Sequence, residues 1–242
     1  MEISRFFYRL HLVDQALQPR AFIGTAFPVA PNGGLLTCRH VVDIATPEDQ
    51  AIAVFDAEES RYVTLESAPI YSTDPAVDLA FLPNAFKRQK PEFFPILTPP
   101  MLKIGEDSYT FGFFAIGARQ ESIEHGYFAG KIVNFFDYRE SAARAKMTLP
   151  FPVLEGMSGS PILTYHNGPK LVGIGIGNRQ IRILASEVIE YRDDRTEFRE
   201  SINRIVEHGV AHHSGAIVNL LVQAGIAGFV VSDQQVPVPN LE

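Results

Sequence analysis

The sequence predicts an all-β protein, built as antiparallel barrels or as a sandwich. About a dozen short apolar runs follow one another from residue 5 to about 185, and turn residues separate them. The 242 residues include 18 Gly and 17 Pro, which favour turns and interrupt helices. With 46% hydrophobic residues, a chain of this length can bury a substantial core, as one β-rich domain or as two small barrels.

The expected strands of the first half either alternate apolar and polar residues or lie between turn signals. They cover residues 6–12, 21–29, 35–37, 51–55, 62–65 and 79–82. The expected strands of the second half meet the same criteria. They cover residues 108–114, 123–128, 131–136, 147–149, 161–164 and 171–176.

A proline-rich stretch at residues 90–100 is the best candidate for an internal boundary. Its four prolines disfavour both a helix and a central strand. Within a core of residues 1–185 we therefore expect a first β-unit over about residues 5–90 and a second over about 100–185. Residues 186–242 form a separate C-terminal segment in this interpretation.

The residue pattern changes in that C-terminal segment. Four apolar residues recur at helical spacing between charged ones, which predicts an exposed amphipathic helix over 193–208. They are Phe198, Ile202, Ile205 and Val206. This helix is either a partner-binding or regulatory insertion or a solvated helix that covers a sheet edge. Residues 215–218 are expected to form a last barrel strand, followed by a short helix that ends near Gly225.

Charge and cysteine content exclude several function classes. The 28 acidic and 21 basic residues give a formal net charge of -7, which offers no basic patch for nucleic acid and argues against an anionic membrane surface. Cys38 is the only cysteine, so an intramolecular disulfide and a cysteine-based zinc site are excluded. We expect a cytoplasmic protein, because the N-terminal residues lack the apolar core of a signal peptide and the cysteine usage fits a reducing compartment.

Three widely spaced residues suggest nucleophilic catalysis. Ser158 lies in the hexapeptide Gly156–Pro161, where a glycine-flanked turn would expose its hydroxyl. Such a hydroxyl attacks a carbonyl only when a base takes its proton and a further group orients that base. His40 is the candidate base and Asp78 the candidate orienting group, and the order His, Asp, Ser is one known arrangement of the triad. Taken alone, Ser158 is more often a turn residue, His40 a structural histidine and Asp78 a strand cap. Their shared order favours the triad.

Six motifs follow one another around these residues. They are Gly24-Thr25-Ala26-Phe27, Leu36-Thr37-Cys38-Arg39-His40-Val41-Val42, Asp78-Leu79-Ala80-Phe81-Leu82, Gly105 with Tyr109-Thr110-Phe111-Gly112-Phe113, Gly156-Met157-Ser158-Gly159-Ser160-Pro161 and Leu171-Val172-Gly173-Ile174. They resemble those of the trypsin-like, chymotrypsin-fold serine peptidases, in particular the disulfide-free bacterial branch with the HtrA/Deg proteases. The resemblance covers roughly residues 20–180.

This resemblance implies two six-stranded antiparallel β-barrels with the active site between them and a helical addition at the C-terminus. It makes Ser158 the nucleophile, His40 the general base and then acid, and Asp78 the group that orients His40. The backbone N–H groups of Gly156 and Ser158 would form the oxyanion hole. No cofactor and no metal is expected.

Two positions depart from the family pattern. Met157 stands where zymogen-activated members have an aspartate that pairs with a new amino terminus, so activation by N-terminal cleavage is not expected. Ser160 replaces a glycine, which the turn should tolerate. Some members keep the oxyanion turn misfolded until a partner binds, which leaves room for an activating protein partner.

By the same resemblance, Pro152 and Val153 would form the base of the primary substrate pocket, with Ile176, Gly177 and Asn178 as its walls. No aspartate falls at the pocket base, so a preference for Lys or Arg lacks its counter-charge. We expect a small or medium apolar residue before the scissile bond.

The adjacent pair His212 and His213 is the remaining metal candidate. Neighbouring residues of a strand point to opposite faces, so a solvated loop is the preferred interpretation.

Two functions remain open at this level. The first is a narrow-specificity intracellular bacterial serine endopeptidase that acts on a protein or peptide, with a regulatory or defence role. The second is a catalytically weak or inactive binding module on the same fold, which a partner would activate.

Overall fold

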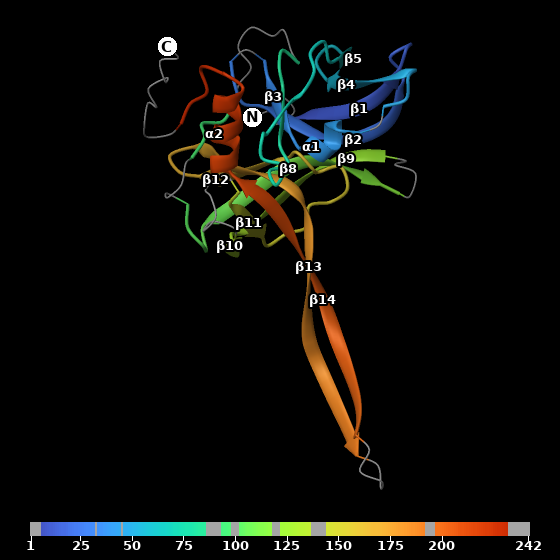
Figure 1. The fold of residues 1–242 in the computed structure, drawn as a ribbon, viewed down its shortest axis with the longest axis vertical. Coiled ribbons are helices and arrows are strands. Elements are labelled where there is room, and N and C mark those ends of the chain that lie inside the picture. The colour runs from blue at the N-terminus through green and yellow to red at the C-terminus, as the bar shows by residue number, and fades with distance from the viewer. Residues whose placement is uncertain are drawn as a thin grey trace.

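The computed structural model describes residues 6–31, 33–44, 46–85, 93–97, 102–117, 122–136, 144–191 and 197–231. The chain forms two antiparallel sheets with seven described strands each, which confirms the all-β prediction (Figure 1). The resemblance implied six strands in each unit rather than seven. No described helix is long and apolar enough to cross a membrane.

The first sheet contains the N-terminal strands in the order β5-β4-β1-β2-β3-β7-β6. Their bounds are β1 (Tyr8–Asp14), β2 (Pro19–Pro28), β3 (Leu35–Thr37), β4 (Gln50–Asp56), β5 (Arg61–Thr64), β6 (Ile70–Tyr71) and β7 (Ala80–Leu82). One helical turn, α1 (Arg39–Val42), follows β3. A register shift between Leu10 and His11 explains why both of these consecutive side chains are buried.

The second sheet has the order β10-β11-β14-β13-β12-β8-β9. Its strands are β8 (Asp107–Ile116), β9 (Ser122–Lys131), β10 (Asn134–Phe136), β11 (Lys146–Leu149), β12 (Pro161–Tyr165), β13 (Pro169–Tyr191) and β14 (Glu197–His213). The helix α2 (Ser214–Gln223) follows. Each of the twelve expected strands corresponds to one of these elements, and only β6 and β14 had no counterpart among them.

We call the two sheets, without the projecting part of β13 and β14, the body of the protein. Two hydrophobic clusters stabilise it. The larger one joins the first sheet, including Phe27 and Phe81, to Leu163 and Ile174 of the second sheet. The smaller one lies within the second sheet, where Met147 and other buried side chains pack together. Because the larger cluster spans both sheets, it fixes the junction where the candidate site lies.

The described part of the predicted linker, residues 93–97, is attached to the body. Leu97 N–H donates to Leu171 O at 2.8 Å, and Ile96 N–H donates to Val230 O at 2.7 Å. The side chains of Phe94, Ile96 and Leu97 are buried. The other residues of the 90–100 stretch lie outside the described residues.

The amphipathic helix expected over 193–208 is wrong. The described residues of that range, 197–208, belong to β14, which pairs with β13 over the whole length of a two-stranded ribbon that projects from the body (Figure 1). Residues four apart share a face in a strand as well as in a helix, so Phe198, Ile202 and Val206 fit both patterns. The β-branched residues of β13 offer a pairing partner that a local pattern cannot reveal.

The strand expected over 215–218 is also wrong, because these residues lie in α2. His213 caps this helix, since its Nδ1 accepts from Gly215 N–H at 3.2 Å. Ala216, Ile217, Leu220 and Leu221 bury one face of α2 against the larger cluster.

Candidate active site

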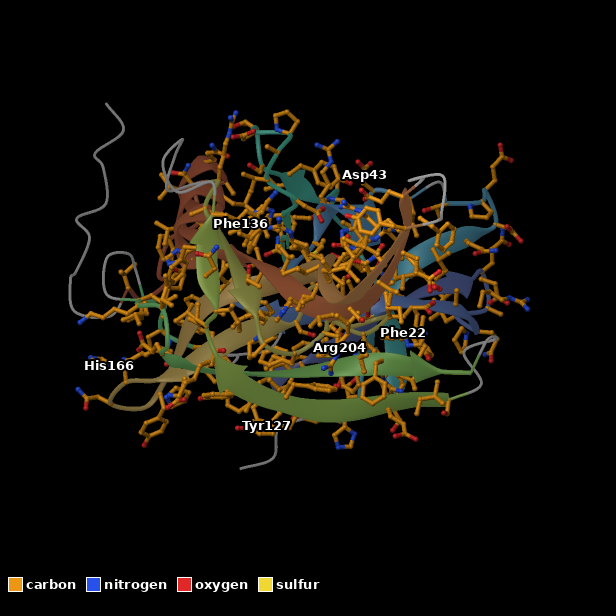
Figure 2. The ribbon with its side chains drawn as sticks, turned by 90° about the horizontal axis from the view of Figure 1, so that it is seen from below. Phe22, Asp43, Tyr127, Phe136, His166 and Arg204 are labelled. Carbon is orange, nitrogen blue, oxygen red and sulfur yellow. The ribbon has the colours of Figure 1, made fainter. Side chains whose placement is uncertain are left out.

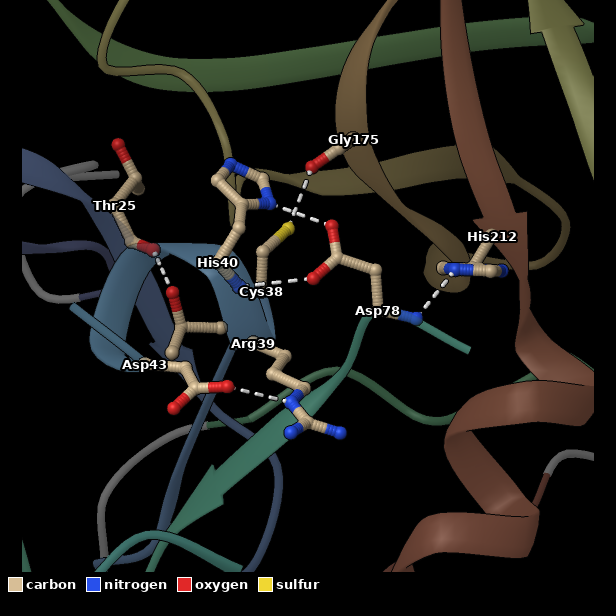
Figure 3. A network of polar contacts seen from close by, with 9 residues as sticks. Thr25, Cys38, Arg39, His40, Asp43, Asp78, Gly175 and His212 are labelled. Atoms are coloured by element: carbon tan, nitrogen blue, oxygen red, sulfur yellow. Dashed lines mark hydrogen bonds and ion pairs between the residues drawn. The ribbon is translucent and has the colours of Figure 1, made fainter. Parts of the chain in front are cut away.

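His40 and Asp78 meet because two strands bring their flanking segments together. β3 pairs with β7, so Thr37 faces Ala80, and His40 lies just beyond one strand while Asp78 lies just before the other. His40 Nδ1 lies 2.5 Å from Asp78 Oδ2, and His40 N–H donates to Asp78 Oδ1 at 2.9 Å (Figure 3). One carboxylate therefore fixes both the backbone and the ring of His40.

The same contacts set the charge of Asp78. Burial raises the pKa of its carboxyl, but the hydrogen bonds from the ring and backbone of His40, with electrostatic interactions with His40 and His212, together hold this pKa below its ordinary value. Asp78 therefore carries a negative charge at neutral pH. This charge favours a proton on His40 Nδ1 and leaves Nε2 as the basic atom.

His212 is a part of the site that the sequence analysis missed. It lies on β14 with no exposed surface, and its Nε2 accepts from Asp78 N–H at 2.9 Å (Figure 3). Acceptance at Nε2 puts the His212 ring proton on Nδ1. The preference for a solvated loop was wrong, because His212 and His213 are both buried. Their position in the run Val210-Ala211-His212-His213 was the available signal for a buried strand.

Ser158 lies in a tight turn between β11 and β12. Met157 N–H donates to Leu154 O and Ser160 N–H to Met157 O, both at 2.9 Å. Gly156 and Gly159 have φ of +91° and +89°, a region that favours glycine. A Cβ on Gly156 would collide with the Phe22 ring, and one on Gly159 with the Thr25 carbonyl.

Thr25 attaches this turn to the first sheet. Its Oγ1 donates to Gly156 O at 2.9 Å, and its N–H donates to Ser158 O at 3.0 Å. Glu155 O accepts from Ala115 N–H of β8 at 3.1 Å. Since the C=O and N–H of a trans peptide point in opposite directions, the Gly156 N–H points away from Ala115. Among the described residues, neither the Gly156 N–H nor the Ser158 N–H has an acceptor.

The carbonyl of Gly175 connects the histidine segment to the serine turn. Gly159 N–H donates to it at 2.9 Å. Cys38 Sγ lies 3.2 Å from the same oxygen (Figure 3). Gly159 follows Ser158 directly, and Cys38 precedes His40 by two residues. The structure thus brings His40 and Asp78 into direct contact. The shared Gly175 carbonyl connects their segment to the turn that contains Ser158.

Cys38, His40 and Asp78 also form the one potential metal-binding group in the described ranges, with ligand atoms within 4.8 Å of one another. Burial, with the nearby Asp78 charge, raises the pKa of the Cys38 thiol well above its usual value. The thiol is therefore protonated and donates to Gly175 O, and the Asp78 oxygens already accept from His40. These donors fit an internal polar network better than a metal site.

The residues expected at the substrate pocket occupy different environments. Asn178 Oδ1 accepts from Val153 N–H at 2.7 Å, and its Nδ2 donates to Val153 O at 3.0 Å. The Val153 side chain is buried in the smaller cluster, whereas Pro152 and Ile176 are half-buried. The position of a Cβ on Gly177 is open. The structure thus joins the two predicted pocket segments through the Asn178 amide.

The chain is similar to a known protein family and to solved structures. Residues 24–174 match the family model of the trypsin-like peptidase domain. No curated protein matches the chain. A solved structure described as the HtrA-type protease AlgW with a decapeptide is similar at 16% identity and a TM-score of 0.56, and the similarity covers 92% of this chain and 65% of that one.

A substituted form of AlgW, also with a decapeptide, is similar at 15% identity and a TM-score of 0.54. That similarity covers 92% of this chain and 64% of the other, so the present chain spans just under two thirds of the length of these relatives. These likenesses establish a shared chymotrypsin-like fold. Because the family model covers more than half of the sequence, the chain belongs to the trypsin-like peptidase domain family.

Proposed function

We propose that this chain is a serine endopeptidase that cleaves peptide bonds through an acyl-enzyme on Ser158. The observation that carries the proposal is the His40–Asp78 pair, attached beside a glycine-flanked serine turn that has two N–H groups without an acceptor among the described residues. This combination supplies a base, an orienting carboxylate, a hydroxyl and oxyanion donors.

In the proposed acylation, the Ser158 hydroxyl attacks the substrate carbonyl and transfers its proton to His40 Nε2. Asp78 holds the proton on His40 Nδ1 and stabilises the imidazolium that forms. The N–H groups of Gly156 and Ser158 donate to the oxygen that becomes negative. Such a donor typically contributes about 2.7–4 kcal/mol to transition-state stabilisation.

The tetrahedral intermediate then breaks its C–N bond. His40 returns its proton to the leaving amine, and the acyl group stays on Ser158. Water enters by the reverse sequence, with His40 again as the base, and the carboxylic acid leaves. All of these steps use groups of this chain and water.

Asn178 supports a small subsite for the residue before the scissile bond. In the proposal, the segments of Val153 and Asn178 line this subsite, as the family resemblance implies. The Asn178 amide connects them through two hydrogen bonds and so holds the two segments together. Replacement Asn178→Ala should extend cleavage from small apolar residues to larger ones in a peptide library. An unchanged preference would contradict this role of Asn178.

A peptide library with product identification by mass spectrometry tests the proposed reaction. The wild-type chain should cleave a subset of peptides, and Ser158→Ala should abolish cleavage. Ser160→Ala is the matched control, because Ser160 lies two positions from Ser158. It removes a buried hydroxyl that has no hydrogen-bond partner among the described residues. Equal cleavage by wild type and Ser158→Ala would overturn the proposal, as would a folded wild type that cleaves no peptide.

A further inference from the structure

The outer part of the β13–β14 ribbon exposes apolar side chains on both faces. Every described residue of 178–205 is exposed, and the ribbon extends away from both sheets (Figure 1). The exposed apolar residues are Ile181, Ile183, Leu184, Val188, Ile189, Tyr191, Phe198, Ile202 and Ile205. An isolated two-stranded hairpin is marginally stable in water, and monomers rarely expose so many neighbouring apolar groups. The ribbon therefore has the properties of an interaction surface.

The register assigns these side chains to two faces, because directly paired residues of adjacent strands share a face. One face, called here the Ile202 face, contains five pairs. They are Ile181–Val206, Ile183–Arg204, Ser186–Ile202, Val188–Glu200 and Glu190–Phe198. The opposite face, called the Ile205 face, contains five others over the same length. They are Arg182–Ile205, Leu184–Asn203, Glu187–Ser201, Ile189–Arg199 and Tyr191–Glu197.

The two faces differ in how their charges are paired. On the Ile205 face, Arg199 forms ion pairs with Glu197 at 2.7 Å and with Glu187 at 3.5 Å. On the Ile202 face, Arg204 and Glu200 have no ionic partner among the described residues. Figure 2 looks at the molecule from below and labels Arg204 on the ribbon. The Ile202 face thus combines more apolar residues with charges that remain to be paired.

We propose that the Ile202 face binds the same face of a second copy of this chain, with the two ribbons antiparallel. The two-fold axis would lie between the two ribbons, perpendicular to the strands, at the level of the Ser186–Ile202 pair. It puts each Ile202 on Ile202 of the second copy. Residues equally distant from this centre then meet, so Val206 packs on Phe198 and Ile183 packs on Val188. The two-fold interface is self-complementary in its apolar contacts.

The charges fit the same arrangement. The axis puts Arg204 opposite Glu200 of the second copy, and it does so twice in the dimer. On the Ile202 face, the half of the ribbon near the body contains two arginines, Arg179 and Arg204. The described outer half of this face contains two glutamates, Glu190 and Glu200.

An antiparallel arrangement puts the basic half of each ribbon on the acidic half of the other, whereas a parallel one would oppose like charges. The charge distribution therefore favours a second copy in this orientation over an unrelated partner.

The first test measures the mass of the full chain in solution by analytical ultracentrifugation and light scattering. The wild type should be a dimer at micromolar concentration. Ile202→Asp should raise the dimer dissociation constant by more than about tenfold, because it places unpaired carboxylates at the centre of the interface. Ile205→Asp is the matched control, because Ile205 is 55% exposed against 59% for Ile202 and lies on the other face.

The control should remain a dimer, and both variants should keep the thermal unfolding of the body. A wild type that is monomeric at high concentration would overturn the proposal. Equal weakening by both variants would overturn it too, because the interface would then not be specific to the Ile202 face.

A charge exchange tests the orientation. Arg204→Glu and Glu200→Arg should each weaken the dimer, because each creates two like-charge contacts across the axis. The double variant should restore dimerisation, and a mixture of the two single variants should form heterodimers. Failure of both the double variant and the mixture to dimerise would contradict the antiparallel arrangement.

Discussion

The two halves of β13 lie in different environments. In its first half the side chains of Leu171 and Ile174 are fully buried, and the Gly175 carbonyl connects the segments of His40 and Ser158. Its second half, after Asn178, is exposed on both faces. The same strand thus supports the candidate site with one half and forms part of the projecting ribbon with the other. The first half of β13 pairs with β12, whereas the second half pairs with β14 alone among the described strands.

The largest expected effect within the body follows from Asp78→Asn. An amide at this position would favour the wrong tautomer of His40, so the proposed peptidase should lose about 10⁴-fold in kcat. The measurement is steady-state hydrolysis of the best peptide, with Glu187→Gln on the ribbon as the control. A loss below about tenfold would contradict the role of Asp78 as the orienting group.

Truncation of a buried side chain in the body should reduce the free energy of unfolding more than truncation of an exposed side chain on the ribbon. Leu36→Ala in the buried β3 should reduce the free energy of unfolding by about 2–5 kcal/mol. Ile183→Ala on the ribbon should change the unfolding of the monomeric body by less than about 0.5 kcal/mol, because this side chain contacts mainly solvent. Denaturant unfolding of both variants in an Ile202→Asp background makes the comparison. Similar losses would remove the distinction between body and ribbon.

His212 links the ribbon strand β14 to the site, so its replacement tests how independent the two regions are. His212→Leu removes the acceptor of the Asp78 N–H and should cost about 1–3 kcal/mol of stability. As a positioning residue, it should also alter the pH dependence of kcat/KM through the His40–Asp78 pair. His212→Gln, which keeps an acceptor, should recover part of both losses. An unchanged pH profile in His212→Leu would restrict His212 to a structural role.

Acid should destabilise the body through two buried histidines. Burial lowers the pKa of His11 to about 4, with the charge of Arg9 as a further cause, and burial lowers that of His213 to about 4. Both are neutral in the folded body but protonate near pH 6.5 when unfolded, so the unfolded state binds more protons between these values. Stability should fall as pH decreases from about 6.5 to about 4. His11→Phe should flatten this dependence in denaturant titrations; an equally steep one would contradict it.

The body could be predicted from sequence because its signals are local. Alternation of apolar and polar residues, with glycine and proline in the turns, predicted strands such as 51–55 and 161–164. The contact of His40 with Asp78 follows from motifs on either side of paired strands. Asn178 and Val153 also meet, but nothing in the sequence predicted that an amide would connect them.

The ribbon could not be predicted in the same way. Its apolar spacing fits a helix or a strand. The choice depends on pairing with residues far away in the sequence, as for Val206, which pairs with Ile181. His212 was missed for a related reason. A histidine next to another histidine is typical of a solvated loop unless the pairing of β14 with β11 and β13 is known.

Ser158 is proposed to be an activated nucleophile in a body that works without the ribbon contact. Labelling with a fluorophosphonate, followed by peptide mapping, measures this activation. The wild type and the Ile202→Asp variant should both carry one adduct, located on Ser158, and Ser158→Ala and Asp78→Asn should carry none or react far more slowly. An adduct on another serine, or an unlabelled wild type that is folded, would contradict the account.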